Sequence, residues 1–556
     1  MMRDTDVKSD LAVLNERCIK NGIPSPIKFS WNGRPSIEKR IHIDLCEVFR
    51  KELVKGTIFK NKYRTLKLED VSQALLGKGK YGSGGISGDN VHTLTIGQQK
   101  QYVLQDAQLV MDLSKANNGQ VMSLMQAIAE LTGLSLEQGC HSSLSTWWTK
   151  VFDDMGCIPS QLSGQGDTRN QPTEYQGGLV IEPKRGLYRN IKVVDVVSLY
   201  PSVAILHNIS FDTVNCPCCI SREDAKVSAE VIDKGYWICK QKEGAFPKKL
   251  RQFKEERVRQ KQLGNEAKQL GLKILINGGY GLFANPEFKY ADIRVAELIT
   301  AYGRYTFRYM QKLAQKYVFE IIAGDTDSLF LSGGSDESLQ DFINHCQRER
   351  GIEVEHQRTF SKFMSIKKKH YIGIDSVTGE AVVKGMEGKK SDRPRWVSRA
   401  FDQFVQDFKE GTPDPTINIK KAISDLESRN VDPEDLKIYV TLSKDPAEYA
   451  ANTMQKRVGL HLGAKKGDVI YYYKSNPGRK KDTTAVPIRS EDISIVEYKK
   501  VLFATVKDAL EIMGFGLESI ESEDIFKIGG KTGKNLQYNQ IIASEHEKEE
   551  DTKVSC

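Results

Sequence analysis

Three aspartates stand inside segments that are otherwise apolar and rich in β-branched residues. Asp195 lies in the run 192–201 (KVVDVVSLYP), and Asp325 and Asp327 lie in the run 318–332 (VFEIIAGDTDSLFLS). Runs of this composition predict buried strands. Because an ionised carboxylate in such a segment is costly unless a cation neutralises it, the three side chains are candidate metal ligands. Their hard oxygen atoms suit Mg²⁺.

The spacing of Asp325 and Asp327 leaves two local geometries open. On one continuous strand, both side chains would point to the same side. A tight turn, which Gly324 favours, would instead present both at its tip. A structural role is the alternative to metal binding, because turn aspartates often hydrogen-bond to the neighbouring backbone.

Positive charge is concentrated in two stretches of the chain. The net charge is only +8, but 248–273 holds nine basic residues against three acidic ones, and 362–399 holds ten against four. Such clusters fit a phosphate-rich partner, although two solvated basic surfaces would give the same counts. On a continuous helix Arg257, Lys261 and Lys268 would share one face, which favours a functional contact.

Four of the ten cysteines are clustered, as Cys216, Cys218, Cys219 and, further along, Cys239. They could form a tetrahedral zinc site, although their C-x-C-C spacing differs from the usual C-x2-C. A loop of reduced thiols and a disulfide are the two alternatives, and the second requires a cytosol that tolerates it.

The elements that position these residues must belong to several structural units. A length of 556 residues predicts roughly three to five of them. Contents of 39% hydrophobic and 28% charged residues exclude global disorder and a disulfide-built miniprotein. No apolar run reaches the roughly 20 residues of a membrane span, and the first ten residues lack the apolar core of a signal peptide. We therefore expect a soluble cytoplasmic protein with no membrane partner.

Local patterns predict a mixed α/β region over the first 160 residues. The segment 41–49 (IHIDLCEVF) is strand-like, while 68–76, 106–115 and 121–133 have helical apolar spacing. The composition of 160–173 predicts a linker, a long basic helical region follows at 247–276, and residues 544–556 form a charged tail.

Five segments resemble motifs of the family B DNA polymerases, in the family's order. They are YQGG at 175–178, DVVSLYPS at 195–202, KILINGGYG at 273–281, GDTDS at 324–328 and KKKHY at 367–371. The sequence around 384–394 (KGMEGKKSDRP) is most similar to that of archaeal replicative polymerases.

This resemblance implies an α/β multidomain (α+β) fold: a right-hand polymerase with palm, fingers and thumb, preceded by a partial RNase H-like 3′–5′ exonuclease domain. The implied limits are 1–125 for the partial exonuclease, 126–172 for a helical connector and linker, 173–240 and 277–385 for the palm, 241–276 for the fingers, and 386–556 for the thumb and tail.

The resemblance also implies template-directed addition of dNTPs to a primer 3′-hydroxyl with two Mg²⁺ ions. Asp195 and Asp327 would be the main ligands, with Asp325 in support and the backbone carbonyl of Val196 as a further ligand. The implied dNTP-binding residues are Ser198, Leu199, Tyr200, Arg257, Lys261, Lys273, Asn277 and Tyr280, with Tyr200 excluding a ribose 2′-hydroxyl by its bulk. The implied primer–template contacts are Tyr175, Gly177, Gly178, Thr326, Lys368, Lys369 and Tyr371.

The chain departs from the family pattern at three places. Gly278 and Gly279 stand where a serine and another residue are usual, which predicts extra backbone freedom. Arg257 and Lys273 are close in sequence, so the fingers helices should be short, with a turn near Gly264. Ala323 replaces an aromatic residue.

The exonuclease motifs are incomplete. Tyr102 and Asp106 resemble the last motif and Asp10 the middle one, but the first has no counterpart, since Asp4 and Asp6 are not substitutes. We therefore expect no proofreading by this chain alone. Either a separate N-terminal polymerase subunit docks here, as in a split polymerase, or the gene product is truncated.

The alternative to an enzyme is a non-catalytic DNA-binding or scaffold subunit. The presence of all three aspartates favours an active enzyme. For a DNA polymerase of this family we expect association with the nucleoid. A sliding clamp is an expected partner, although the tail contains no clamp-binding peptide, so that contact would lie on another subunit.

Overall fold

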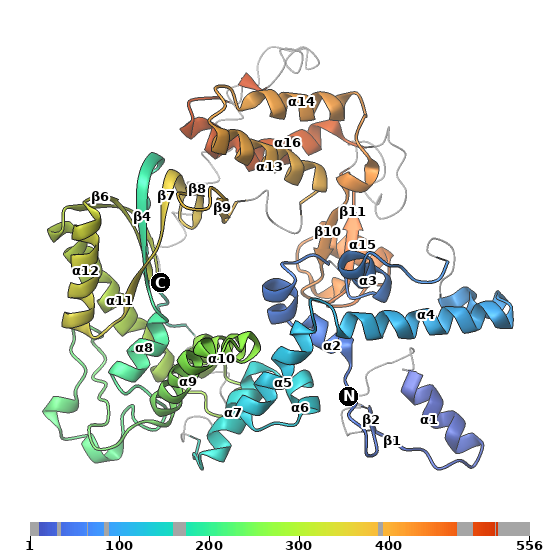
Figure 1. The fold of residues 1–556 in the computed structure, drawn as a ribbon, viewed down its shortest axis with the longest axis horizontal. Coiled ribbons are helices and arrows are strands. Elements are labelled where there is room, and N and C mark those ends of the chain that lie inside the picture. Colours follow the sequence, from blue (N-terminus) through green and yellow to red (C-terminus); the bar gives the residue numbers. More distant parts are fainter. Residues whose placement is uncertain are drawn as a thin grey trace. The chain divides into compact units, whose positions relative to one another are not determined.

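The computed structural model describes residues 10–29, 35–63, 65–82, 88–159, 174–386, 393–474, 493–516 and 519–520. The linker expected at 160–173, the segment 387–392, the tail and Asp4 and Asp6 lie outside these ranges. Two compact units form (Figure 1): Met1–Gly385 with Ile438–Tyr472, and Met386–Lys437 with Tyr473–Cys556. Among the described helices, none is both long enough and apolar enough to cross a bilayer.

A seven-stranded antiparallel sheet forms the centre of the first unit. Its order is β3-β5-β6-β4-β7-β8-β9. The strands are β3 (Val180–Ile181), β4 (Gly186–Val196), β5 (Phe319–Asp325), β6 (Ser328–Gly333), β7 (Val354–Lys367), β8 (His370–Asp375) and β9 (Ala381–Lys384). The two segments predicted as buried strands are therefore β4 and the β5–β6 hairpin, which are neighbours in the sheet.

The two faces of this sheet are covered differently. Val194, Leu329 and Leu331 belong to the large hydrophobic core, where α8 (Leu199–Leu206), α11 (Ile293–Lys316) and α12 (Asp336–Arg350) pack (Figure 1). Val193 and Phe330, on the opposite face, belong to a small aromatic cluster. Because side chains alternate along a strand, Asp195 lies on the same face as Val193.

The basic helical region consists of two helices. These are α9 (Ala245–Gln262) and α10 (Glu266–Gly278), which pack against each other and enclose Gly264 in a left-handed conformation (Figure 1). The expected turn near Gly264 is confirmed. The expectation of one face shared by Arg257, Lys261 and Lys268 is wrong, because Lys268 lies beyond the turn and forms an ion pair with Glu130 at 2.8 Å.

The region before residue 160 is mainly helical. Its described elements are α1 (Asp10–Lys20), β1 (Ile27–Phe29), β2 (Pro35–Ile37), α2 (Leu45–Arg50), a π-helix at Leu53–Ile58, α3 (Leu68–Leu76), α4 (Ile96–Ser114), α5 (Gln120–Thr132), α6 (Leu136–His141) and α7 (Leu144–Asp154). The helices expected at 68–76, 106–115 and 121–133 are present as α3, α4 and α5. The strand expected at 41–49 is wrong, because Asp44 caps α2 by accepting a hydrogen bond from the backbone N–H of Cys46.

The described residues of 1–125 do not form the RNase H-like sheet that we expected there. Their only strands are β1 and β2, which pair as one short hairpin. Strand formation in such a fold depends on pairing partners from elsewhere in the sheet, and the described part of this region supplies none beyond that hairpin.

The second unit is a cluster of helices. It contains α13 (Arg395–Glu410), α14 (Thr416–Glu427) and α16 (Ile495–Ile512), and the hydroxyl of Tyr498 on α16 donates to the carbonyl oxygen of Leu436 at 2.5 Å. The strands β10 (Ile438–Thr441) and β11 (Val469–Tyr472) pair, and together with α15 (Met454–His461) they belong to the first unit. The segment 386–556, expected as one domain, thus contributes to both units.

Candidate active site

The two neighbouring aspartates lie at the end of a hairpin, which we call the Asp hairpin (Phe319–Gly333). Asp325 is the last residue of β5, Thr326 and Asp327 form the turn, and Ser328 begins β6. Thr326 is left-handed, with φ of 59°, and the N–H of Asp327 donates to the carbonyl oxygen of Asp325 at 2.6 Å. Of the two local geometries, the turn is the one formed.

Asp195 is brought to this turn by the pairing of β4 with β6. It is the register partner of Ser328, whose Oγ donates to Asp195 Oδ1 at 2.5 Å and lies 3.4 Å from Asp327 Oδ1. The N–H of Val196 donates to the carbonyl oxygen of Asp327 at 2.9 Å. Ser328 therefore joins two carboxylates that are 132 positions apart in the chain, a role that sequence reasoning missed.

The surroundings of these two carboxylates disfavour their charged forms. Burial raises the pKa of Asp195, and the negative charge of Glu355, its register partner on β7, raises it further. Burial and the charge of Asp195 raise the pKa of Asp327 to about 6. Among the described residues no cationic side chain forms an ion pair with either carboxylate, so the two carboxylates remain candidate ligands of a cation.

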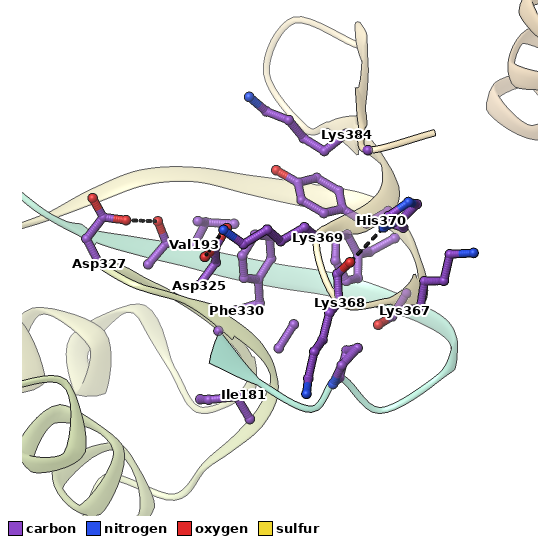
Figure 2. Close-up of a pocket in the computed structure, with 18 of the residues that line it drawn as sticks. Ile181, Val193, Asp325, Asp327, Phe330, Lys367, Lys368, Lys369, His370 and Lys384 are labelled. Carbon is purple, nitrogen blue, oxygen red and sulfur yellow. Dashed lines mark hydrogen bonds and ion pairs between the residues drawn. The ribbon is translucent and has the colours of Figure 1, made fainter. Parts of the chain in front are cut away.

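Asp325 has a different environment from the other two aspartates. Its Oδ1 lies 3.3 Å from Lys369 Nζ, and Figure 2 shows the two side chains pointing toward each other. A cavity of about 420 Å³ lies beside this pair and is lined by both carboxylates of the Asp hairpin, by Phe330 and by Lys367, Lys368 and Lys369 (Figure 2). Lys368 Nζ lies 2.7 Å from Glu182 Oε2. The predicted primer–template lysines thus lie next to the Asp hairpin.

Tyr371 packs among the aromatic side chains on this face of the sheet and also lines the cavity. Its ring centroid lies 5.1 Å from that of Phe330 and 5.3 Å from that of Phe363. Burial raises the pKa of its phenol to about 12. The side chain therefore supports the sheet face from which the lysines emerge.

Five of the residues predicted to bind dNTP come together where β4 leads into α8. Ser198 has a left-handed backbone, and its Oγ donates to Asn277 Oδ1 at 3.0 Å. The ring centroids of Tyr200 and Tyr280 lie 4.4 Å apart, while Leu199 is buried at the start of α8. The turn after Asp195 is thus tied to the C-terminal end of α10.

The basic residues predicted to bind the triphosphate lie on α9 and α10. Lys273 is exposed on the same face of α10 as Asn277, four residues later. Lys261 is exposed near the end of α9, while Arg257 is half-buried and its Nε has no hydrogen-bond partner among the described atoms. In the part of the chain that the structure describes, none of the three contacts the aspartates.

The segment Tyr175–Gly178 is held against the same site. The guanidinium of Arg304 donates to the carbonyl oxygen of Gly177 at 2.8 Å. The N–H of Thr326 donates to the carbonyl oxygen of Leu179 at 2.9 Å. A Cβ on Gly178 would lie 2.7 Å from Thr326 Oγ1 and 2.8 Å from the Tyr200 hydroxyl, so only glycine fits. Arg304 was missed by sequence reasoning, although an arginine within the apolar face of α11 is the feature that could have revealed it.

A comparison of the whole sequence with protein families now decides where the chain belongs. Residues 98–473, more than half of the chain, match the family model described as DNA polymerase family B. The chain belongs to DNA polymerase family B. The family inferred from the five motifs is confirmed.

Archaeal DNA polymerases are among the relatives of this family B chain. It is 29% identical to DNA polymerase 1 of Aeropyrum pernix over 91% of this chain and 56% of the relative, and 28% identical to DNA polymerase 1 of Sulfolobus acidocaldarius over 87% and 59%. The chain spans less than two thirds of the length of these relatives. The solved family B DNA polymerase of Pyrobaculum calidifontis has the same fold, with a TM-score of 0.60 and 21% identity over 91% of this chain and 69% of that one.

The glycine pair that departs from the family B pattern has a packing explanation. A Cβ on Gly278 would lie 2.5 Å from Leu144 Cδ2, and one on Gly279 would lie 2.9 Å from the indole of Trp148. Gly279 has φ of −63°, and Trp148 Nε1 donates to the carbonyl oxygen of Leu275 at 3.1 Å. Close approach of α7 to α10 therefore gives a packing reason for glycine at both positions.

The residues that resemble exonuclease motifs are engaged by a lysine. Lys80 Nζ donates to the Tyr102 hydroxyl at 2.8 Å and lies 2.8 Å from Asp106 Oδ2. Both partners lie on α4, whereas Asp10 is the first residue of α1. Sequence reasoning missed Lys80, which neutralises the carboxylate that a metal would otherwise need.

The four clustered cysteines are brought together. Their Sγ atoms all lie within 4.8 Å of one another.

Proposed function

We propose that this chain catalyses template-directed DNA synthesis, adding dNTPs to a primer 3′-hydroxyl. The observation that carries the proposal is the joining of Asp195 and Asp327 through Ser328, beside the Tyr200–Tyr280 pair and the lysines at the turn between β7 and β8. In this assignment the sheet β3–β9 with its helices is the palm, α9 and α10 are the fingers, and 386–556 holds the thumb.

Mg²⁺ fits the oxygen ligands of Asp195 and Asp327, which have raised pKa values and no cationic partner among the described residues. When bound there, two such ions would supply activation of the attacking hydroxyl and neutralisation of the leaving pyrophosphate. Ser328 holds the two carboxylates in a shared orientation through its hydroxyl. Asp325 supports the turn while its charge is balanced by Lys369.

The incoming nucleotide would lie between the Asp hairpin and α10. Arg257, Lys261 and Lys273 would neutralise the triphosphate. Negative charge spreads over the phosphoryl oxygens during the transfer, and positive side chains stabilise it. Tyr200 would exclude a ribose 2′-hydroxyl by steric clash, and it is held in place by its contact with Tyr280.

The primer–template would contact the cavity side of the sheet. Lys368 and Lys369 lie at its rim and would bind backbone phosphates without sequence preference. Gly177, Gly178 and Thr326 form the adjacent wall, which Arg304 fixes through the backbone of Gly177.

We further propose that this chain alone does not proofread. The Lys80–Asp106 ion pair supports this, because the carboxylate that should bind a metal is already neutralised. Exposed apolar residues on α4, Val103 and Leu104 with exposed fractions of 61% and 69%, support docking of a separate N-terminal polymerase subunit.

A primer-extension gel tests this function. Purified protein is incubated with Mg²⁺ and a 5′-labelled primer–template, with and without dNTPs. Wild-type protein should extend the primer, Asp195→Asn and Asp327→Asn should not, and Asp341→Asn, an exposed aspartate on α12, should behave as wild type. Without dNTPs the primer should keep its length.

The opposite outcomes are equally clear. Tight DNA binding without extension by wild-type protein would favour the scaffold subunit. Shortening of the primer without dNTPs, in pure protein, would contradict the absence of proofreading.

A further inference from the structure

The loop that connects α8 to α9 brings four thiols to one point. Cys216 precedes a single 3-10 turn, Pro217–Cys219, and Cys239 returns to it from the far side of the loop. Cys218 Sγ lies 3.5 Å from Cys216 Sγ, 3.8 Å from Cys219 Sγ and 3.5 Å from Cys239 Sγ, and Cys219 Sγ lies 3.9 Å from Cys239 Sγ. Cys216, Cys219 and Cys239 are buried, and Cys218 is exposed.

We propose that these four cysteines form a structural zinc site. With Zn–S bonds of about 2.3 Å, the sulfur atoms of a regular tetrahedron lie about 3.8 Å apart. Four of the six sulfur–sulfur distances, at 3.5–3.9 Å, match that edge length, and the other two are no longer than 4.8 Å. The sequence C-P-C-C also contains the ordinary C-x2-C pair, Cys216 and Cys219, with Cys218 as an additional ligand.

The ligand chemistry selects zinc over the other metals of this enzyme class. All four donors are soft sulfur atoms, which suit Zn²⁺ and not Mg²⁺. Among the described residues, the group of potential metal ligands at this point consists of the four cysteines alone, with no histidine or carboxylate. Convergence of all four sulfurs on one point differs from two separate disulfides, which would draw the atoms into pairs at about 2.05 Å.

The backbone around the thiols is arranged to stabilise negative sulfur. The N–H of Gln241 donates to Cys239 Sγ at 3.4 Å. Burial alone would raise the pKa of Cys239, but N–H groups of Gln241 and Lys242 and the neighbouring thiols lower it to about 7. Burial and the neighbouring thiols of Cys218, Cys239 and Cys219 raise the pKa of Cys216 to about 12. Without a cation only part of the cluster can ionise, whereas a metal would hold all four as thiolates.

The metal would fasten the loop to the start of α9. The amide of Asn208 donates to the carbonyl oxygens of Cys239 at 3.0 Å and Lys242 at 2.8 Å, and its Oδ1 accepts from the N–H of Gly244 at 2.7 Å. Gly244 immediately precedes α9, the helix that carries Arg257 and Lys261. Zinc binding would thus fix the loop that precedes the first residue of α9.

Metal analysis of the purified full chain tests the site. Protein prepared without chelator should contain one zinc per chain by elemental analysis, released when a mercurial reagent titrates the thiols. X-ray absorption should show four sulfur neighbours at about 2.3 Å. Cys219→Ser and Cys239→Ser should lose the zinc, and Cys346→Ser, a buried thiol on α12 outside the cluster, should retain it.

A second measurement keeps the test valid if the serine variants misfold. Wild-type protein stripped of metal and refolded with Co²⁺ should show the intense sulfur-to-cobalt absorption of a tetrahedral thiolate site. A metal-free protein whose four thiols all react with a thiol reagent would overturn the proposal. Iron in place of zinc, or a mass reduced by the hydrogens lost in disulfide formation, would overturn it as well. None of these readouts uses polymerase activity.

Discussion

The carboxylates of Asp195 and Asp327 repel each other when no cation is bound. A folded-state pKa of about 6 for Asp327, above the ordinary value of about 3.9, means that its charged form destabilises the metal-free fold. This loss of stability develops as the pH rises from about 4 to above 6, because the unfolded chain releases the proton first.

Asp327→Asn should therefore stabilise the protein in EDTA. At pH 8 we expect the free energy of unfolding to rise by about 1 kcal/mol, a value reduced for solvent screening of a half-buried group. At pH 5 the gain should fall to about half. Urea unfolding at both pH values measures it, with Asp341→Asn as the control. A loss of stability at pH 8 would show that the carboxylate is neutralised by another group.

Tyr200 carries the predicted choice between deoxyribose and ribose. Tyr200→Val should raise the relative kcat/KM for rNTPs over dNTPs by about tenfold or more, since the clash with the 2′-hydroxyl is removed. Tyr200→Phe keeps the ring and should keep the discrimination. Single-nucleotide incorporation with matched rNTP and dNTP measures both. If Tyr200→Val lowered kcat/KM equally for rNTP and dNTP, the ring would only pack against Tyr280.

At the scale of elements, the contact between α7 and α10 depends on the absence of two side chains. Gly279→Ala would press a methyl group against Trp148, and overpacking of this kind costs about 1–3 kcal/mol of unfolding free energy. Gly281→Ala is the matched control, because nothing lies within 4 Å of a Cβ there. Chemical unfolding of both variants measures the difference. Equal stabilities would mean that Trp148 can move away at little cost.

The same contact links the N-terminal helices to α10. Trp148 donates to the backbone of Leu275 and its ring packs against Phe246 of α9, with centroids 5.2 Å apart. Trp148 therefore contacts both α9 and α10, the helices that carry the basic residues predicted to bind the triphosphate. This packing gives a reason for glycine at the end of α10.

At the scale of the whole molecule, the modest net charge of +8 conceals a local basic surface beside the Asp hairpin. Each lysine that contacts a phosphate makes the logarithm of DNA affinity fall more steeply with the logarithm of salt concentration. Lys368→Ala should lower the magnitude of this slope by about 0.9. Lys150→Ala, an ion-paired lysine on α7, should leave it unchanged. Fluorescence anisotropy with a primer–template across salt concentrations measures both slopes, and an unchanged slope for Lys368→Ala would remove this lysine from the interface.

The sequence by itself determined the features that depend on neighbouring residues. Helix α3 was predicted at its observed limits, the turn at Gly264 was expected, and the segments containing Asp195, Asp325 and Asp327 proved to be adjacent strands and their turn. Apolar periodicity, glycine and β-branched runs act over a few residues, so they can be interpreted without the fold. The five motifs likewise identified the family, because their residue types and order lie within the sequence itself.

Only the tertiary structure decided which distant groups meet. The hydrogen bonds of Ser328 to Asp195, of Arg304 to Gly177 and of Lys80 to Tyr102 join residues far apart in sequence, and no local pattern encodes them. The segment 41–49 became partly helical because an aspartate cap and packing overrode its strand-like composition. The convergence of four sulfurs depends on the path of a whole loop, which spacing alone left open between zinc, free thiols and a disulfide.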